Sequence, residues 1–318
     1  MKIVILDGYA ANPGDLSWDG LRQYGELTVY DRTKPEQIVP RIGAAEIVLT
    51  NKAIIDDAVM AQCPNLKLVS VLATGYNVVD LEAARKRGIT VCNVPAYSTP
   101  DVAQMTFALL LEICQHVGLH SQAVHSGKWC SSRDFCFWDA PLLRLAGKTM
   151  GLVGFGSIGR QVAAIAQAFG MDVLVSSRTP HPEAESAHLR FCSTDEMLQK
   201  ADVVTLHCPL TEQTKELIDA DALAKMKDGA ILINTARGGV IDEAAVAAAL
   251  KSGKLSAFGA DVVSVEPIRE NNPLLGCENA VLTPHIAWAT KEARTKLLAV
   301  SAANVGAFLA GKPQNVVN

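Results

Sequence analysis

A glycine-rich turn constrains the fold of this chain more than any other feature. Gly154, Gly156 and Gly159 follow the apolar stretch 149–153 in the spacing G-x-G-x-x-G, and a helix-like segment begins at Arg160. Between a strand and a helix, the first glycine permits a tight turn and the second lets the backbone approach a pyrophosphate. The third lets the helix pack closely on the strand. The sequence therefore predicts a dinucleotide-binding βαβ unit.

The residues around this turn also bear on the choice of cofactor. Ser157 and Ile158 lie within the turn and are expected at the cofactor, and the free N–H groups at the start of the following helix are expected to bind the pyrophosphate. An acidic residue about 20 positions further on usually binds the ribose of NAD, but here Ser177 and Arg178 follow the strand 172–176. An arginine can pair with the 2′-phosphate of NADP, so these residues favour NADP. Alternatively, Arg178 is solvated and NAD binds without the acid.

Composition excludes several classes of protein. The chain has 318 residues, of which 49% are hydrophobic and 19% charged, and its net charge is −4. Two domains are expected, because a single core stops growing near roughly 250–300 residues. The scattered Lys and Arg residues argue against a nucleic-acid partner, and no apolar run reaches the roughly 20 residues of a membrane span. The eight cysteines show no C-x-x-C spacing, which favours reduced thiols and a cytoplasmic protein.

Apolar strands alternate with helical segments in two blocks, a pattern typical of doubly wound α/β domains with parallel sheets. The first block has strand candidates at 2–6, 46–49, 67–71 and 90–94. The second has six, at 149–153, 172–176, 203–207, 230–234, 257–261 and 280–283. Six strands match a complete Rossmann domain, and the last helix, 291–309, is free to pack on the first block. We therefore predict a Rossmann dinucleotide-binding domain (98–288) inserted in a flavodoxin-like substrate domain (1–97 and 289–318).

A long helix and a long loop lie at the start of the second block. The helix is predicted over 101–116, with Thr99 as its N-cap and Pro100 at its first position. The stretch 126–138 has no periodicity and is predicted to be a functional or interfacial loop. Its aromatic residues favour a core or dimer contact over a substrate contact. His116 and His120 have the spacing of one helix face, but without a third ligand no metal site is predicted.

Three polar segments end the last three strand candidates, and they contain Arg237, Glu266 and His285. Ligands of doubly wound sheets lie beyond the carboxyl ends of the strands, so we expect these side chains to converge. Reducing a 2-keto acid requires a proton for the alkoxide and a cation for the carboxylate. Histidine is the natural acid near neutral pH, a carboxylate beside it orients the ring, and the planar guanidinium of arginine matches a carboxylate. Each residue alone would more often be structural.

Over its full length the chain resembles the D-isomer-specific 2-hydroxyacid dehydrogenases, and among them the glycerate dehydrogenases, also called hydroxypyruvate reductases. The resemblance is carried by the segments VGFGSIG (153–159), LHCPLT (206–211), INTARGGVIDE (233–243), PHIAWA (284–289) and GKPQNVV (311–317). It implies reduction of hydroxypyruvate or glyoxylate, with Arg237 binding the substrate and Glu266 paired with His285, the acid/base. It also implies a homodimer formed through the nucleotide domain.

The resemblance implies further contacts with the cofactor and the substrate. Beyond the glycine-rich turn, Ser177 and Arg178, the residues expected at the cofactor are Thr99, Cys208, Pro209, Thr235 and Asp261. Of these, Asp261 is expected to contact the nicotinamide carboxamide, and Thr99 to lie near the nicotinamide. The backbone at Thr74 and Gly75 is expected to bind the substrate carboxylate. Lys52 is either a further positive charge near that carboxylate or a solvated turn residue.

Two departures from the family pattern stand out. Ser177 replaces the usual acid, which puts a preference for NAD in doubt, and Gln104 replaces a more usual glutamate with no consequence that we can derive. Two alternatives stay open at this point. One is a dehydrogenase of another D-2-hydroxy acid, such as 3-phosphoglycerate. The other is a nucleotide-sensing protein like the co-repressors of the family, against which the complete set of Arg237, Glu266 and His285 argues.

Overall fold

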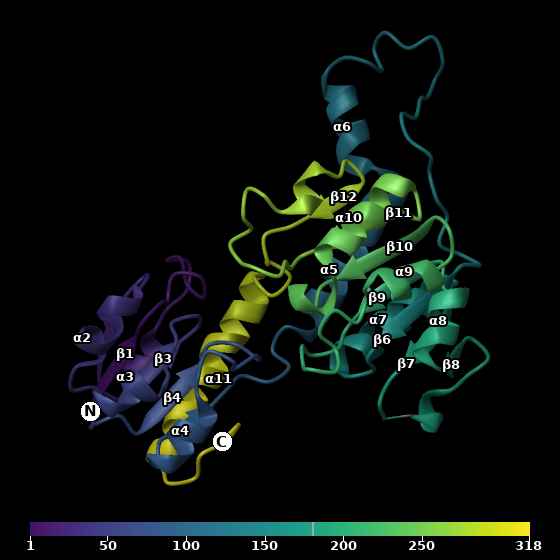
Figure 1. The fold of residues 1–318 in the computed structure, drawn as a ribbon. Helices are drawn as coiled ribbons and strands as arrows, with labels where there is room; N and C mark the ends of the chain where they lie inside the picture. The colour runs from purple at the N-terminus through teal and green to yellow at the C-terminus, as the bar shows by residue number, and fades with distance from the viewer. Residues whose placement is uncertain (180) are drawn as a thin grey trace. The chain divides into compact units, whose positions relative to one another are not determined.

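The computed structural model describes residues 1–179 and 181–318. The chain divides into two units (Figure 1). Unit 1 consists of Met1–Ser98 and Trp288–Asn318, and unit 2 consists of Thr99–Ala287. Unit 2 is thus inserted between the two segments that form unit 1.

Unit 1 is built on a sheet of five parallel strands in the order β2-β1-β3-β4-β5, the flavodoxin-like order 2-1-3-4-5. The strands are β1 Lys2–Ile5, β2 Glu26–Val29, β3 Ile47–Thr50, β4 Leu68–Val71 and β5 Thr90–Cys92. The edge strand β2 is missing from the predicted strands. Its side chains alternate between exposed and half-buried, so it lacks the continuous apolar run of the buried strands.

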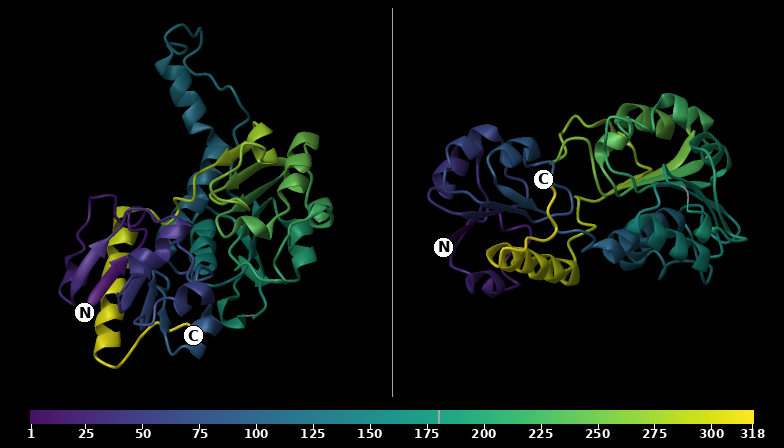
Figure 2. Two further views of the ribbon diagram at one scale, coloured as in Figure 1. Left: turned by 60° about the vertical axis from the view of Figure 1, so that its left-hand side comes forward. Right: turned by 90° about the horizontal axis from the view of Figure 1, so that it is seen from below.

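Helices cover both faces of this sheet. One face packs against short helices, namely α2 Ile38–Ile42, α3 Asp57–Ala61 and α4 Leu81–Lys86; the 3-10 turn η1 Pro35–Gln37 precedes α2. The other face packs against α1 Asp19–Arg22 and the long helix α11 Lys291–Leu309 (Figure 2). Within α11, Leu297 and Val305 are fully buried against this sheet. The last helix of the chain therefore completes the core of unit 1.

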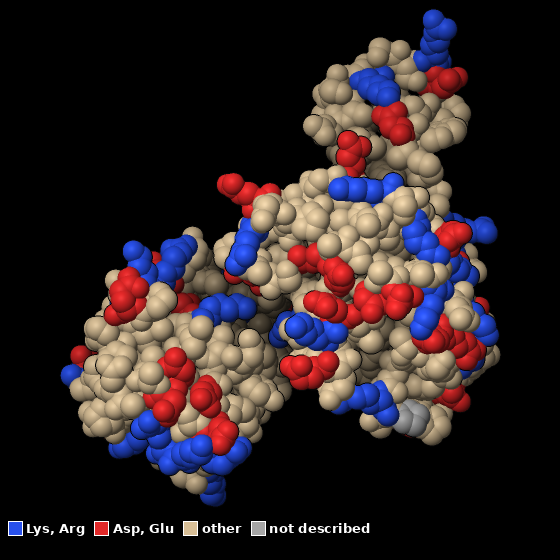
Figure 3. Space-filling view, viewed as in Figure 1, with Lys and Arg blue, Asp and Glu red and all other residues tan. Residues whose placement is uncertain are grey.

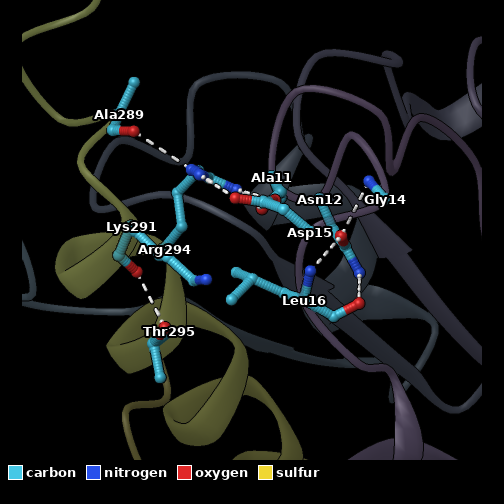
Figure 4. Close-up of polar contacts among 9 residues, drawn as sticks. All are labelled: Ala11, Asn12, Gly14, Asp15, Leu16, Ala289, Lys291, Arg294 and Thr295. Carbon is cyan, nitrogen blue, oxygen red and sulfur yellow. Dashed lines mark hydrogen bonds and ion pairs between the residues drawn. The ribbon is translucent and has the colours of Figure 1, made fainter.

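A buried arginine fixes the loop after β1 to α11. Figure 4 shows the guanidinium of Arg294 turned toward the carboxylate of Asp15, which it binds through two hydrogen bonds of 2.7 and 2.8 Å. Nε of Arg294 also donates to the carbonyl of Ala289 (3.0 Å). The Arg294 side chain is only 10% exposed, and its hydrogen bond holds the pKa of Asp15 below the usual value. The pair ties the β1–α1 loop to the start of α11.

Unit 2 is built on seven parallel strands in the order β12-β11-β10-β9-β6-β7-β8. The strands are β6 Thr149–Val153, β7 Asp172–Ser176, β8 Leu189–Phe191, β9 Val203–Leu206, β10 Ala230–Asn234, β11 Leu255–Ala260 and β12 Ala280–Leu282. Counted from β6, this is the Rossmann order 3-2-1-4-5-6 with one further strand. The prediction of six strands was wrong by one, because β8 has only three residues and one buried side chain.

Helices also cover both faces of the larger sheet. On one face α5 Thr99–Gln115 packs beside α7 Ser157–Ala168. The other face carries α8 Thr194–Lys200, α9 Ala220–Lys225 and α10 Glu243–Ser252. Short 3-10 turns complete the unit, namely η2 Pro182–Ala184, η3 Gly238–Val240 and η4 Pro273–Gly276. Every residue of β9 and β10 is buried, as expected for the centre of a doubly covered sheet.

An arm, residues 117–138, projects from unit 2 (Figures 1 and 2). It begins with α6 Val117–His125, which is separated from α5 by His116 in the left-handed conformation. His116 and His120 therefore do not share one continuous helix. The described residues contain no cluster of three or more His, Cys, Asp or Glu able to hold a metal ion. Among them no single helix could cross a membrane; α5 and α6 pass that test only together, with a bend of 58°.

Trp129, Phe135 and Trp138 of the arm are exposed, whereas Phe137 is half-buried. Phe135 is 89% exposed, Trp138 66% and Trp129 51%, so the interpretation of these side chains as core residues is wrong. Side chains other than Lys, Arg, Asp and Glu form most of the visible surface of the arm in Figure 3. An exposed aromatic surface of this kind is typical of a protein–protein contact.

Candidate active site

The glycine-rich turn joins β6 to α7 in a shape that requires glycine. Gly154 has φ +96°, and a Cβ there would lie 2.7 Å from the carbonyl oxygen of His207. A Cβ on Gly159 would lie 2.4 Å from the oxygen of Gly154. A Cβ on Gly156, by contrast, would meet nothing within 4 Å. Gly156 is the N-cap residue of α7, and no side chain caps this end of the helix. The open cradle and the uncapped N–H groups fit the pyrophosphate of a dinucleotide.

β7 and β9 pair with β6 on its two sides, so the ends of both strands lie beside this turn. Ser177 is half-buried and Arg178 is exposed, and the positive charge of Arg178 acts on the thiol of Cys208, whose pKa burial raises. Pro209 follows and is exposed. His207, just before Cys208, has its pKa lowered to about 3 by burial and is therefore neutral. Its Nε2 lies 3.0 Å from Oγ1 of Thr205.

Two threonines of the expected cofactor set have different surroundings. Oγ1 of Thr99, at the start of α5, donates to Oγ of Ser157 (3.3 Å), so these two expected residues lie together at the glycine-rich turn. Thr235 follows β10 and is 7% exposed, and its hydroxyl lies 3.0 Å from that of Thr106 on α5. The hydroxyl of Thr235 is thus already hydrogen-bonded within unit 2. The backbone of Thr235 is the part that can face a cofactor at the strand end.

The carboxyl ends of β11 and β12 bring Glu266 and His285 together. Nδ1 of His285 lies 2.6 Å from Oε2 of Glu266, and the two side chains are 26% and 31% exposed. Because a carboxylate only accepts hydrogen bonds, Nδ1 is assigned as the protonated ring nitrogen. Nε2 is then the ring nitrogen that faces away from Glu266.

Asp261, at the end of β11, fixes the segment that contains His285. Its carboxylate accepts a hydrogen bond from Oγ1 of Thr283 (2.6 Å). It also accepts the N–H groups of Ile286 (2.9 Å) and Ala287 (2.8 Å). Asp261 is 1% exposed, and His285 between these contacts has φ +55°. Three hydrogen bonds to one buried carboxylate therefore hold the histidine in a conformation that few non-glycine residues adopt.

Arg237 follows β10 in a turn held by Asn234. The Asn234 side chain donates to the carbonyl of Arg237 (2.9 Å) and accepts from N–H of Ala236 (3.0 Å). The Arg237 side chain is exposed. A Cβ on the next residue, Gly238, would lie 1.9 Å from the carbonyl carbon of Val263. The segment that contains Arg237 therefore packs directly on the loop that contains Glu266.

The remaining expected residues belong to unit 1, where they follow β3 and β4. N–H of Lys52 donates to the carboxylate of Asp7 (2.5 Å), which also accepts the N–H groups of Asn51 and Ala53. Thr74, beside Gly75, donates its hydroxyl to the carbonyl of Val94 (2.8 Å). Sequence reasoning missed Asp7, although a carboxylate directly after an apolar strand was a usable signal. The side chain of Lys52 is exposed.

Comparisons with known proteins agree with this geometry. Residues 107–287 match the family model described as the D-isomer specific 2-hydroxyacid dehydrogenase, NAD binding domain. A hydroxypyruvate reductase of Blautia hydrogenotrophica is 51% identical, and the match covers all of both chains. A glycerate dehydrogenase of Methylorubrum extorquens is 40% identical over 99% of this chain and 98% of that protein. A solved structure of an acyclic imino acid reductase with NADPH and D-Arg is 30% identical, with a TM-score of 0.85 over all of both chains.

The family model covers more than half of the chain, and it describes the part that contains the glycine-rich turn and the three strand-end residues. The full-length relatives extend the match to unit 1. The chain therefore belongs to the D-isomer-specific 2-hydroxyacid dehydrogenases, oxidoreductases that act on small 2-keto and 2-hydroxy acids with a nicotinamide cofactor.

Proposed function

We propose that this enzyme reduces hydroxypyruvate to D-glycerate and glyoxylate to glycolate, and catalyses the reverse oxidations. The observation that carries the proposal is the 2.6 Å contact between His285 and Glu266. The loop of Glu266 packs in turn against the segment of Arg237. The names of two full-length relatives, a hydroxypyruvate reductase and a glycerate dehydrogenase, support the same substrate.

The nicotinamide cofactor, when bound, supplies the hydride that reduces the keto carbon. The uncapped start of α7, with Gly154, Ser157, Ile158 and the other residues of the turn, would hold its pyrophosphate. The further cofactor residues that we propose are Thr99, Ser177, Arg178, Cys208, Pro209, Thr235 and Asp261. Of these, Asp261 has both carboxylate oxygens bonded to its own chain. Asp261 is therefore proposed to have two roles: it contacts the cofactor, and its hydrogen bonds hold the segment that contains His285.

We assign NADP as the preferred cofactor. A carboxylate at the end of β7 would repel a 2′-phosphate and accept hydrogen bonds from free ribose hydroxyls. Ser177 stands there instead and can donate to a phosphate, and the exposed Arg178 adds positive charge. A relative of the same fold is known with NADPH bound, so this fold is compatible with the larger cofactor.

His285 is proposed as the acid and base of the reaction. Its Nδ1–H is held by Glu266, so Nε2 donates the proton to the keto oxygen in reduction and takes it back in oxidation. Glu266 thereby determines which ring nitrogen is free to face the substrate. Such acid–base catalysis contributes typically about 10²- to 10⁴-fold in rate.

Arg237 is proposed to bind the carboxylate of the substrate through its planar guanidinium. In unit 1 we assign substrate binding to the N–H groups at Thr74 and Gly75 and to the exposed ammonium group of Lys52. The hydrogen bonds of Asp7 to the backbone around Lys52 and of Thr74 to Val94 support this assignment, because they make the two strand ends rigid.

The exposed arm is proposed to form a homodimer through unit 2. Val117, Phe135 and Trp138 are 61%, 89% and 66% exposed, and burying such side chains is the main driving force of most association. Light scattering should give twice the chain mass, and Phe135→Glu with Trp138→Glu should give monomers. We place the enzyme in the cytoplasm, where its eight free cysteines would stay reduced.

A panel of 2-keto acids assayed with NADPH and NADH tests the proposal. Hydroxypyruvate and glyoxylate should give the highest kcat/KM, pyruvate and 3-phosphohydroxypyruvate should give lower values, and the glycerate formed should be the D-isomer. Turnover of 3-phosphohydroxypyruvate above hydroxypyruvate would assign a different substrate. Cofactor binding without turnover of any keto acid would indicate a nucleotide sensor instead.

A further inference from the structure

We propose that Glu243 is a positioning residue, whose carboxylate holds the loop after β11 so that Glu266 keeps its contact with His285. The proposal rests on the proposed function, because it takes Glu266 to act on the catalytic histidine. Glu243 itself acts through this loop rather than on the substrate.

The proposal begins from three hydrogen bonds that converge on one carboxylate. Oε1 of Glu243 accepts the backbone N–H of Ser264 (2.6 Å). Oε2 accepts the hydroxyl of Ser264 (2.8 Å) and the side-chain amide of Asn272 (2.9 Å). Ionised acceptors form shorter and stronger hydrogen bonds than neutral ones. Glu243, which is half-buried, therefore binds the loop of Ser264 and Asn272 strongly.

The anchored residues lie on either side of Glu266. Residues 261–272 join β11 to η4 without a helix or strand, and Ser264 to Glu270 are all exposed. A loop with so few buried contacts opens easily unless polar contacts hold it. Glu243 supplies such contacts two residues before Glu266 and six residues after it. Asn272 also caps η4 through N–H of Leu274 (3.0 Å), so this end of the loop joins a fixed element.

The same loop packs against the segment that contains Arg237. A Cβ on Gly238 would lie 2.2 Å from the backbone nitrogen of Ser264, the nitrogen that donates to Glu243. The Ser264 peptide is therefore in close contact with Gly238 and hydrogen-bonded to Glu243. This arrangement fixes Glu266 relative to both Arg237 and His285, which is what proton transfer at a defined distance requires.

A helix-capping role does not account for the conformation of Glu243. The N-terminus of α10 is capped by the neighbouring Asp242, whose side chain accepts N–H of Ala244 (2.9 Å) and Ala245 (3.1 Å). Glu243 still gains from the helix dipole, so a purely structural role has to be tested. Asp242→Ala is the matched control, because it removes the cap of α10 and leaves the bonds between Glu243 and the loop in place.

The experiment measures kcat and KM for hydroxypyruvate, the Kd of NADPH and the melting temperature. The variants are Glu243→Ala, Glu243→Gln, Asp242→Ala, Glu266→Gln and the double variant Glu243→Ala/Glu266→Gln. Glu243→Ala should lower kcat about 10- to 100-fold, the range in which an ångström-scale misplacement falls, and leave the Kd of NADPH unchanged. Glu243→Gln should lose less, because its one carbonyl oxygen still accepts from Ser264. Asp242→Ala should lower the melting temperature and leave kcat unchanged.

The double variant tests whether Glu243 acts through Glu266. If it does, removing Glu243 has little further effect on kcat once Glu266 is replaced, because residues of one network are not additive. Equal losses from Glu243→Ala in both backgrounds would overturn the proposal, as would a wild-type kcat for Glu243→Ala beside an impaired Glu266→Gln. A wild-type kcat for Glu266→Gln would instead contradict the proposed function. If Glu243→Ala does not fold, Glu243→Gln takes its place in the same cycle.

Discussion

Replacing Gly238 with alanine should separate the two strand-end segments of unit 2. The added Cβ would lie 1.9 Å from the carbonyl carbon of Val263 and 2.1 Å from its oxygen, whereas real Cβ atoms essentially never approach other heavy atoms within 3.0 Å. The contact is with backbone, so the loop must retreat by at least about 1 Å. Such a shift would stretch the 2.6 Å hydrogen bond of Glu266 to His285 beyond its normal length.

A misplacement of this size lowers a rate by about 100-fold, or about 2.7 kcal/mol in the barrier. We therefore expect Gly238→Ala to lower kcat/KM for hydroxypyruvate by this order, measured from the absorbance of the reduced cofactor. The Kd of NADPH should not change, because the glycine-rich turn is untouched. Gly276→Ala is the control, since nothing lies within 4 Å of its Cβ. Wild-type kinetics for a folded Gly238→Ala protein would refute the coupling of the two segments.

Three further predictions test individual side chains. Arg237→Lys keeps the charge but loses the planar fork, so both KM and kcat for hydroxypyruvate should worsen; unchanged kinetics would make Arg237 structural. Ser177→Asp should reverse the cofactor preference toward NADH by repelling the 2′-phosphate, and a wild-type enzyme that already prefers NADH by kcat/KM would contradict the assignment. Burial lowers the pKa of His207 from 6.5 to about 3, so between these pH values the unfolded chain binds a proton that the folded one does not. The free energy of unfolding should therefore fall with decreasing pH by up to about 1.4 kcal/mol per unit. His207→Gln should remove this component in urea unfolding, and identical slopes would contradict it.

The sequence was sufficient for the sheets because buried parallel strands are continuous apolar runs. Strands such as β7 and β10 occupy the predicted residues, and the doubly wound α/β class is confirmed. The strands that escaped prediction are β2 and β8, two edge strands with partly exposed side chains. The break between α5 and α6 escaped as well, because it depends on the left-handed conformation of His116, which the residue type does not dictate.

The candidate site, like the fold, could be predicted only in part from the sequence. Arg237, Glu266 and His285 could be singled out because each lies in the polar segment that follows an apolar strand, where the topology alone brings ligands. The contacts that hold these three residues in place could not be predicted. Glu243 meets Ser264 and Asn272 at separations of 21 and 29 residues, and Gly238 meets Val263 across two strand ends. Such contacts depend on how loops of different strands pack, and no local pattern in the sequence encodes them.

The central claim is that His285 exchanges a proton with the substrate while Glu266 holds its ring. Steady-state reduction of hydroxypyruvate by His285→Gln, together with the Kd of NADPH for the same variant, tests it most directly. We expect kcat to fall by about 10²- to 10⁴-fold with the Kd unchanged, because the glycine-rich turn and the strand ends that surround it keep their structure. A folded His285→Gln enzyme that reduces hydroxypyruvate at the wild-type rate would contradict the account.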